Sequence, residues 1–191
     1  MQLVVDVGNT ETVIGLASSV RELAGHWRIS SGVSRTADET TALIRAFLSN
    51  EGLSASNIER GVVGSVVPAA NRVWTKTLGR IVTGDVFAIS PQSELPIELD
   101  VEEPMSVGAD RIANTLAGRE LYHRDTIVVD LGTATTFDCI TSEGVFKGGV
   151  ISPGLLTGID WLASRTAKLP RVELTPPRAV IGRRTETCIQ S

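Results

Sequence analysis

Cysteine is scarce in this chain. Its two cysteines, Cys139 and Cys188, are isolated from each other and from any other metal-ligand pattern. This argues against a cysteine-ligated metal site. Cys139 falls within a strand pattern, where it is expected to be a small buried side chain.

Long apolar runs and an excess of positive charge are also missing. No segment approaches the roughly 18 apolar residues of a transmembrane helix, and the N-terminus enters a strand with no signal peptide before it. Eighteen basic against 22 acidic residues give a net charge of −4, which disfavours nucleic acid and anionic membranes as partners. We therefore expect a cytoplasmic protein. Its 191 residues and 42% apolar content suffice for one large or two small domains with a buried core.

The most informative feature of the sequence is a pair of similar motifs, each of which is a predicted short strand followed by a polar turn. The first motif spans residues 4–10 (VVDVGNT) and the second spans residues 128–135 (VVDLGTAT). The apolar β-branched runs predict buried strands, and the glycine that follows each run leaves backbone N–H groups free to receive a phosphate. The aspartate repels phosphate, so its natural partner is a cation shared with the phosphate oxygens. The threonine supplies a neutral donor.

A single D-x-G-x-T is explained equally well as a strand end with a polar turn, but here the unit occurs twice. Both copies continue into an apolar segment, a polar turn and a glycine-containing strand. These parts are residues 12–17, Ser18-Ser19 and 23–29 in the first copy, and 136–140, 142–144 and 145–151 in the second. The recurrence predicts two similar domains facing each other across a cleft, with a nucleotide between them.

The rest of the chain alternates helix and strand patterns. Thr36 and Glu39 form a predicted capping box at the start of a helix, and Pro68 ends a buried strand at 61–67. Residues 90–103 have no clear period and are predicted to be a loop. The other expected elements are a helix at 69–78, a strand at 86–89, a helix that opens at 108–111, and a helix at 155–167 with Leu156, Ile159, Leu162 and Ala163 inside.

Four motifs together resemble type III pantothenate kinase. They are DVGNT near the N-terminus, GADRIAN at Gly108–Asn114, DLGTATTFD at Asp130–Asp138 and GGVISPG at Gly148–Gly154. They stand in the order of that family, which belongs to the acetate kinase/sugar kinase/Hsp70/actin superfamily. The resemblance implies an α/β fold of two ribonuclease H-like domains facing across a cleft, at 1–117 and 118–191, with the second one incomplete in this chain.

The resemblance also implies a reaction, the ATP-dependent phosphorylation of pantothenate to 4'-phosphopantothenate in the first step of coenzyme A biosynthesis. Asp110 matches the catalytic base, and Arg111 matches the arginine that grips the substrate carboxylate with its planar fork. Gly108 and Ala109 match further pantothenate contacts. Thr185 matches a threonine that reaches the site from the neighbouring subunit of a homodimer. From the residues alone, Asp110 is also explained as an acid favoured by the helix macrodipole, and Thr185 as a helix-start hydroxyl.

The same resemblance implies ATP and cation sites. The matching ATP contacts are Asp6, Val7, Gly8, Asn9, Thr10 and Thr133. Asp6 would hold Mg²⁺ through water, and Asp130 would hold a monovalent cation, K⁺ or NH₄⁺.

Two departures from the family pattern affect the prediction. Val101 stands where the family usually has a tyrosine that contacts pantothenate, which bears on substrate affinity and identity. The chain also ends at Ser191, where family members continue into a glycine-rich adenosine-binding segment, so we expect either a fragment or a fold completed by a partner chain. The alternatives are a phosphatase acting on nucleotide or polyphosphate, a regulator of gene expression, and an inactive relative that binds nucleotide.

Overall fold

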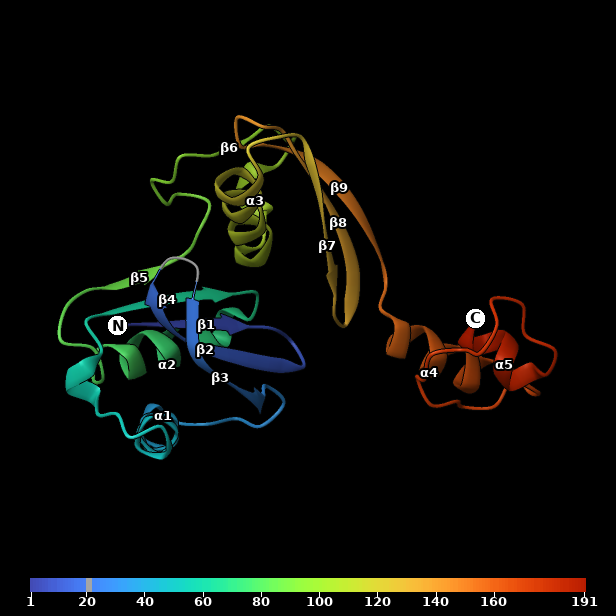
Figure 1. Cartoon of the computed structure of the whole chain (residues 1–191), viewed down its shortest axis with the longest axis horizontal. Coiled ribbons are helices and arrows are strands. Elements are labelled where there is room, and N and C mark those ends of the chain that lie inside the picture. The colour runs from blue at the N-terminus through green and yellow to red at the C-terminus, as the bar shows by residue number, and fades with distance from the viewer. Residues whose placement is uncertain (20–21) are drawn as a thin grey trace.

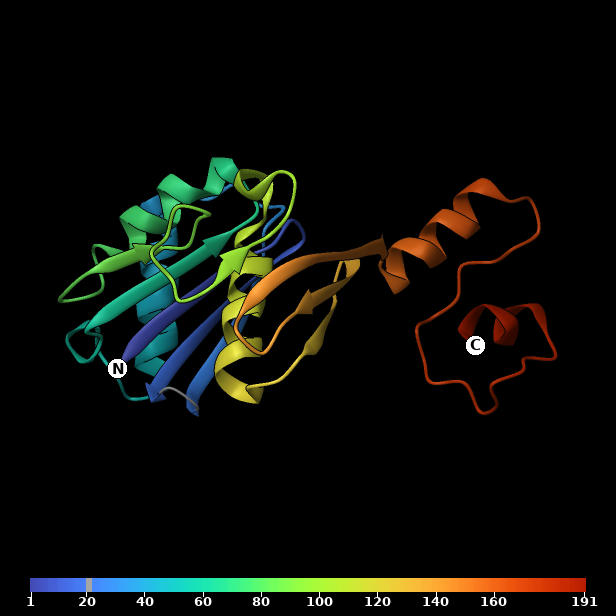
Figure 2. The same cartoon turned by 90° about the horizontal axis from the view of Figure 1, so that it is seen from above.

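The computed structural model describes residues 1–19 and 22–191, and it builds two β-sheets joined by a helix (Figures 1 and 2). The first sheet has the strand order β3-β2-β1-β4-β5. Its strands are β1 (Gln2–Val7), β2 (Glu11–Ser19), β3 (Glu22–Ser30), β4 (Arg60–Ser65) and β5 (Val86–Ala88). β1 pairs antiparallel with β2 and parallel with β4, so β1 is the central strand. β4 lies between β1 and β5, and both β1 and β4 are interior strands, as their β-branched runs predict. The predicted turn at Ser18-Ser19 is displaced, because β2 continues through Ser19 and residues 20–21 lie outside the described residues.

Two helices cover one face of the first sheet, and Figure 1 shows both below it. They are α1 (Ala37–Asn50) and α2 (Pro68–Leu78). The capping box is confirmed, because Glu39 N donates to Thr36 Oγ1 at 3.3 Å and Thr36 N donates to Glu39 Oε2 at 2.7 Å. The cluster beneath the helices forms the core of this half, and its buried members are Leu3, Val5, Val7, Ile14, Leu16, Ile44, Leu48, Ile58, Val63, Trp74, Leu78 and Ile81.

The second sheet has the order β6-β9-β8-β7. Its strands are β7 (Thr126–Leu131), β8 (Ala134–Ile140), β9 (Val145–Pro153) and β6 (Glu98–Leu99). The short β6 lies inside the segment predicted to be a loop. A two-residue strand has no periodicity of its own and forms because β9 offers an edge, where Asp100 N donates to Phe146 O at 3.0 Å. The same region carries a 3₁₀ turn at Pro104–Ser106, and another lies at Ala55–Asn57.

Helix α3 (Ala109–Tyr122) joins the two sheets, because it contacts β4 of the first and β7 and β8 of the second. Ala109 lies near Gly64 on β4, and the other end of the helix passes close to β8. There Gly118 is buried, and a methyl group at this position would lie 3.0 Å from Ile140 Cδ1. The expected domain boundary between residues 117 and 118 falls within this helix.

The last two helices, α4 (Leu155–Arg165) and α5 (Thr185–Gln190), extend away from the first sheet in both views (Figures 1 and 2). The expectation that four apolar residues of α4 are buried is wrong for Leu156, which is 60% exposed, and right for Ile159, which is 6% exposed. The reason is that α4 leaves the end of β9 and covers little of the second sheet. Within the described ranges, no helix combines the length and the apolar character needed to cross a membrane.

Candidate active site

The two loops that follow Asp-x-Gly, one after β1 and one after β7, lie against each other. Thr10 Oγ1, after β1, and Thr133 Oγ1, after β7, are 2.7 Å apart, although the residues are separated by 123 positions in the chain. The loops that follow the two strands therefore meet at a common point. Sequence reasoning predicted that these loops meet, and this hydrogen bond is the direct contact between them.

Each loop is a tight turn closed by its glycine. Gly8 N donates to Glu11 O at 3.0 Å, and Gly132 N donates to Ala134 O at 3.0 Å. A side chain at residue 8 is disfavoured, because its Cβ would lie 2.9 Å from Glu11 O. Since both glycine N–H groups are engaged within the turns, the groups left to receive a phosphate include the side chains of Asn9, Thr10 and Thr133, all of which are exposed or partly exposed.

Three carboxylates surround this meeting point. Asp6 is the next-to-last strand residue before the first loop, Asp130 holds the same place in β7, and Asp110 lies in the first turn of α3. Partial burial, followed by repulsion from Asp110 and Asp130, raises the pKa of Asp6 above its ordinary value of 3.8. Partial burial, followed by repulsion from Asp110 and Asp138, raises the pKa of Asp130. Both residues keep substantial exposure overall, so water still reaches the site.

This charge arrangement is suited to a cation. Carboxylate oxygens are the ligands preferred by Mg²⁺ and by other hard cations, and a positive charge between them would relieve their mutual repulsion. Within residues 1–19 and 22–191, no group of three or more His, Cys, Asp or Glu side chains is close enough to form a metal site unaided. A cation held here would therefore complete its coordination with water or with phosphate oxygens.

The N-terminus of α3 presents Asp110 and Arg111 to the same region. Gly108 is the N-cap, and a Cβ there would collide with Asp110 Oδ1. That oxygen accepts a hydrogen bond from Arg111 N at 2.8 Å, which fixes the carboxylate at the helix end. Ala109, between Gly108 and Asp110, is 5% exposed and packs toward the first sheet.

Arg111 turns toward the second sheet. Its Nε donates to Asp138 Oδ1 at 2.6 Å, and its guanidinium carbon lies 4.8 Å from the centroid of the Phe146 ring. Asp138 has no exposed side-chain surface, and its Oδ2 accepts a hydrogen bond from Asn114 Nδ2 at 3.2 Å. Sequence reasoning assigned no role to Asp138. The sequence did contain an indication: Asp138 is two residues before Ile140 in the same strand, so this charged side chain lies on the same face of β8 as the buried Ile140.

One predicted substrate residue, Thr185, lies outside this group. Thr185 is the first residue of α5, is exposed, and belongs to the part of the chain that extends from the first sheet. Val101 packs near β9, since a Cβ at Gly148 would lie 3.7 Å from Val101 Cγ1. Gly148 has φ = 98°, a conformation in which side chains other than glycine are strained.

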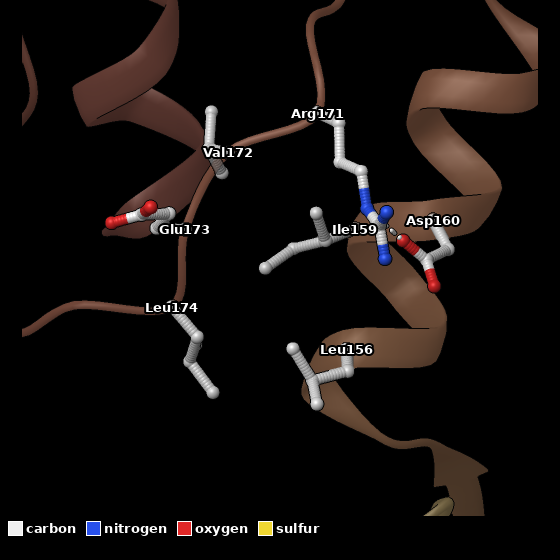
Figure 3. Close-up of a pocket in the computed structure, with 7 residues that line it drawn as sticks. All are labelled: Leu156, Ile159, Asp160, Arg171, Val172, Glu173 and Leu174. Carbon is white, nitrogen blue, oxygen red and sulfur yellow. Dashed lines mark ion pairs between the residues drawn. The ribbon is translucent and has the colours of Figure 1, made fainter.

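A separate pocket of about 400 Å³ lies between α4 and the segment at 171–174 (Figure 3). Apolar side chains of Leu156 and Ile159 face Leu174 across it, and Arg171 Nε pairs with Asp160 Oδ1 at 2.8 Å on its edge. None of the predicted site residues lines this pocket.

Comparisons with known proteins identify the family to which this chain is similar. The type III pantothenate kinase family model matches residues 2–191. The chain is 42% identical over 191 residues to a type III pantothenate kinase of Moorella thermoacetica, an alignment that covers 100% of this chain and 75% of that protein.

Two solved structures share the fold. One, named as a Baf family transcriptional activator from Campylobacter jejuni, matches with a TM-score of 0.57 and 19% identity over 98% of this chain and 71% of its own. The other, named as a 2-dehydro-3-deoxygalactonokinase from Sinorhizobium meliloti, matches with a TM-score of 0.51 and 12% identity over 87% of this chain and 58% of its own. At these identities the two structures support the mixed α/β fold alone.

Proposed function

The chain belongs to the type III pantothenate kinase family, whose members phosphorylate pantothenate with ATP in coenzyme A biosynthesis, and we propose that the two loops and the N-terminus of α3 form its active site. The observation that carries the proposal is the 2.7 Å contact between Thr10 and Thr133 beside three carboxylates. The contact between the loops, together with the repulsion that Asp110 exerts on Asp6 and Asp130, supports a single site that contains both predicted phosphate loops and the predicted base. An enzyme of this kind is a nucleotide-binding transferase.

The nucleotide side of the site consists of the two loops. We assign the ATP contacts to the first loop and to Thr133, and the members of the set are Asp6, Val7, Gly8, Asn9, Thr10 and Thr133. The hydroxyls of Thr10 and Thr133 share one hydrogen bond, so a phosphate oxygen placed between the loops would exchange that bond for one from each threonine. The neighbouring carboxylates repel the phosphates and cannot bind them, so the hydrogen bonds to the phosphates must come from neutral donors such as these hydroxyls.

The acidic side chains divide between two cations. Asp6 would hold Mg²⁺ through water, and Asp130 would hold a monovalent cation, K⁺ or NH₄⁺. The raised pKa values of both carboxylates fit this assignment, because each is destabilised in its charged form and would be relieved by a cation. When bound, the cations neutralise charge on the phosphate oxygens.

Asp110 takes the proton from the primary hydroxyl of pantothenate as that oxygen forms its bond to the γ-phosphorus and the bond from phosphorus to ADP breaks. Its Oδ1 is held by the N–H of Arg111, which leaves Oδ2 to receive the proton. Arg111 binds the substrate carboxylate, with Gly108 and Ala109 forming the backbone beside it. Phosphoryl transfer depends mainly on positioning and charge neutralisation, and this site offers both.

The test is formation of 4'-phosphopantothenate by the purified protein, detected by mass spectrometry, with ATP and pantothenate in buffers containing either K⁺ or Na⁺. We expect product that depends on ATP and on K⁺. Nucleotide binding without any product in K⁺ would refute the kinase assignment and favour a relative that binds nucleotide without turnover.

We also propose a homodimer in which Thr185 of one subunit contacts pantothenate in the other. Thr185 is exposed on α5, the part of the chain farthest from the first sheet in Figure 1. Mixing Asp110→Asn subunits with Thr185→Val subunits tests this proposal. In each mixed dimer, one site would contain the native Asp110 of one subunit and the native Thr185 of the other, so activity should return. Activity that stays at the level of the separate variants would refute the contribution of Thr185 across the dimer.

The two sheets, finally, support the expected division into two ribonuclease H-like domains, at 1–117 and 118–191. In both halves, the strand that ends in Asp-x-Gly pairs antiparallel with the next strand, which pairs antiparallel with a third. We propose that α3 is the element shared between them. We further propose a cytoplasmic location, where ATP is available.

A further inference from the structure

We propose that Asp138, supported by Asn114, is a positioning residue that holds the Arg111 guanidinium in the orientation needed to bind the substrate carboxylate. The inference rests on the proposed role of Arg111 and extends it to two residues that do not touch the substrate. Three observations carry it: the burial of Asp138, the way in which its two oxygens are shared, and one arginine nitrogen that is left without a partner.

Asp138 is a fully buried carboxylate with both oxygens engaged. Oδ1 accepts from Arg111 Nε at 2.6 Å, and Oδ2 accepts from Asn114 Nδ2 at 3.2 Å. A buried carboxylate is tolerated when it is paired and hydrogen-bonded in this way. Arg111 and Asn114 lie one turn apart on α3, so they grip the carboxylate from the same helix face.

The arrangement fixes the plane of the guanidinium. The ring of Phe146 lies 4.8 Å from the guanidinium carbon, and Gly149 borders its far end, where a Cβ would lie 2.7 Å from Nη2. Gly149 is paired in register with Asp138 across β8 and β9, and a side chain at residue 149 would collide with Phe137 O and with Nη2. The arginine is therefore held on one edge by charge and on one face by an aromatic ring.

One donor of this arginine remains unused. Nη2 is buried and has no hydrogen-bond partner among the described residues. In many arginine–carboxylate pairs Nε and Nη2 share the two oxygens of one carboxylate, but here Asn114 occupies the second oxygen of Asp138. A buried donor without an acceptor is unfavourable, and a substrate carboxylate would supply the missing acceptor. Asn114 thus keeps Nη2 available.

A purely structural role is the alternative, in which the ion pair only fastens α3 to the second sheet. That role predicts that its loss affects all substrates and the melting temperature together. The positioning role predicts a selective loss for substrates that carry a carboxylate.

The experiment compares Asp138→Asn with the wild-type protein, using pantothenate and pantothenol, the analogue with an alcohol in place of the carboxylate. We expect the KM for pantothenate to rise about 10- to 100-fold, the loss typical of a charge-assisted hydrogen bond. We expect kcat, the KM for ATP and kcat/KM for pantothenol to stay within about threefold of wild type. Glu120→Gln, which removes an exposed carboxylate from the same helix, serves as the control and should change none of these values.

Arg111→Gln, measured in parallel, separates this inference from the proposed function. If Arg111→Gln weakens pantothenate selectively and Asp138→Asn does not, the positioning role is refuted while Arg111 keeps its own. If Arg111→Gln has no selective effect, the proposed carboxylate site itself is wrong and the positioning role fails with it. Should Asp138→Asn fail to fold, Asn114→Leu carries the test. It leaves the ion pair charged, and an unchanged KM for pantothenate in this variant would refute the inference.

Discussion

Replacing Asp110 with asparagine is the most direct test of the proposed mechanism, because the substitution removes the proposed base and keeps the shape of the side chain. The contact that fixes Asp110 in the structure is the hydrogen bond from Arg111 N to Oδ1 at 2.8 Å. An amide oxygen accepts the same bond, so the side chain should stay in place. A positioned general base typically contributes about 10²- to 10⁴-fold in rate. We expect kcat to fall by that factor.

The stability of this variant should change little. An acid in the first turn of a helix contributes about 0.3–1 kcal/mol through the macrodipole, and this contribution is lost. The repulsion that Asp110 exerts on Asp6 and Asp130 is lost as well, and this loss stabilises the folded protein. For a chain of this length 1 kcal/mol corresponds to about 2–4 °C, so the melting temperature should stay within about 4 °C of wild type.

The assay couples ADP release to a spectroscopic signal at saturating ATP, with calorimetry to measure ATP binding and Glu120→Gln as the control on the same helix. ATP affinity should be retained, because the loops that contact the nucleotide are unchanged. A kcat within tenfold of wild type would remove Asp110 from the proton transfer. A loss of ATP binding as large as the loss of turnover would show that the substitution damages the site as a whole.

Three further predictions concern the loops and the first helix. Asp130→Asn should raise the melting temperature of the nucleotide-free protein at pH 7. The pKa of Asp130 is raised in the folded state, so the charged carboxylate destabilises the folded protein at pH 7. As the pH falls toward 3.8, the ordinary pKa of an aspartate, the wild-type carboxylate takes up a proton. The difference in melting temperature between the variant and the wild type should therefore shrink. Thr10→Val removes the hydrogen bond to Thr133 and one phosphate donor, so the KM for ATP measured in initial-rate assays should rise about tenfold while the KM for pantothenate holds. Thr36→Ala removes the cap that pairs with Glu39 and should cost about 1 kcal/mol, seen as a fall of about 2–4 °C in melting temperature with kcat unchanged.

Local chemistry made part of this fold predictable from the sequence. The capping box at Thr36 depends on two side chains three residues apart, and the strands that lead to Asp6 and Asp130 depend on short β-branched runs. The capping box and both strands are determined by neighbours in the chain, and all three appear in the structure. Burial of the second strand was predicted wrongly, because Ile127, Val129 and Leu131 of β7 are 63%, 47% and 69% exposed. Cys139 on β8 is exposed as well, although its strand pattern predicted burial. The meeting of Thr10 with Thr133 was predictable for a different reason, because a repeated unit implies a symmetric arrangement of its two copies.

Features that depend on distant partners were not predictable in the same way. β6 exists because β9 offers an edge, and residues 98–99 carry no pattern of their own. The apolar stripe of α4 predicted burial, but a periodic pattern does not say whether another element lies against it, and Leu156 is exposed. Asp138 stood within a motif that pointed to the site, yet its partnership with Arg111 depends on how α3 packs on the second sheet.

The absence of a side chain at Gly118 bears on catalysis from a distance. Eight residues of helix, roughly 12 Å along its axis, separate Gly118 from Asp110. The Ile140 side chain lies against Gly118, and a methyl group at residue 118 would lie 3.0 Å from Ile140 Cδ1. Either the Ile140 side chain or the helix would have to shift by a few tenths of an ångström. A shift of the helix would also move the proposed base at its other end. The packing of α3 against the second sheet at Gly118 is therefore linked, through the helix itself, to the position of the proposed base.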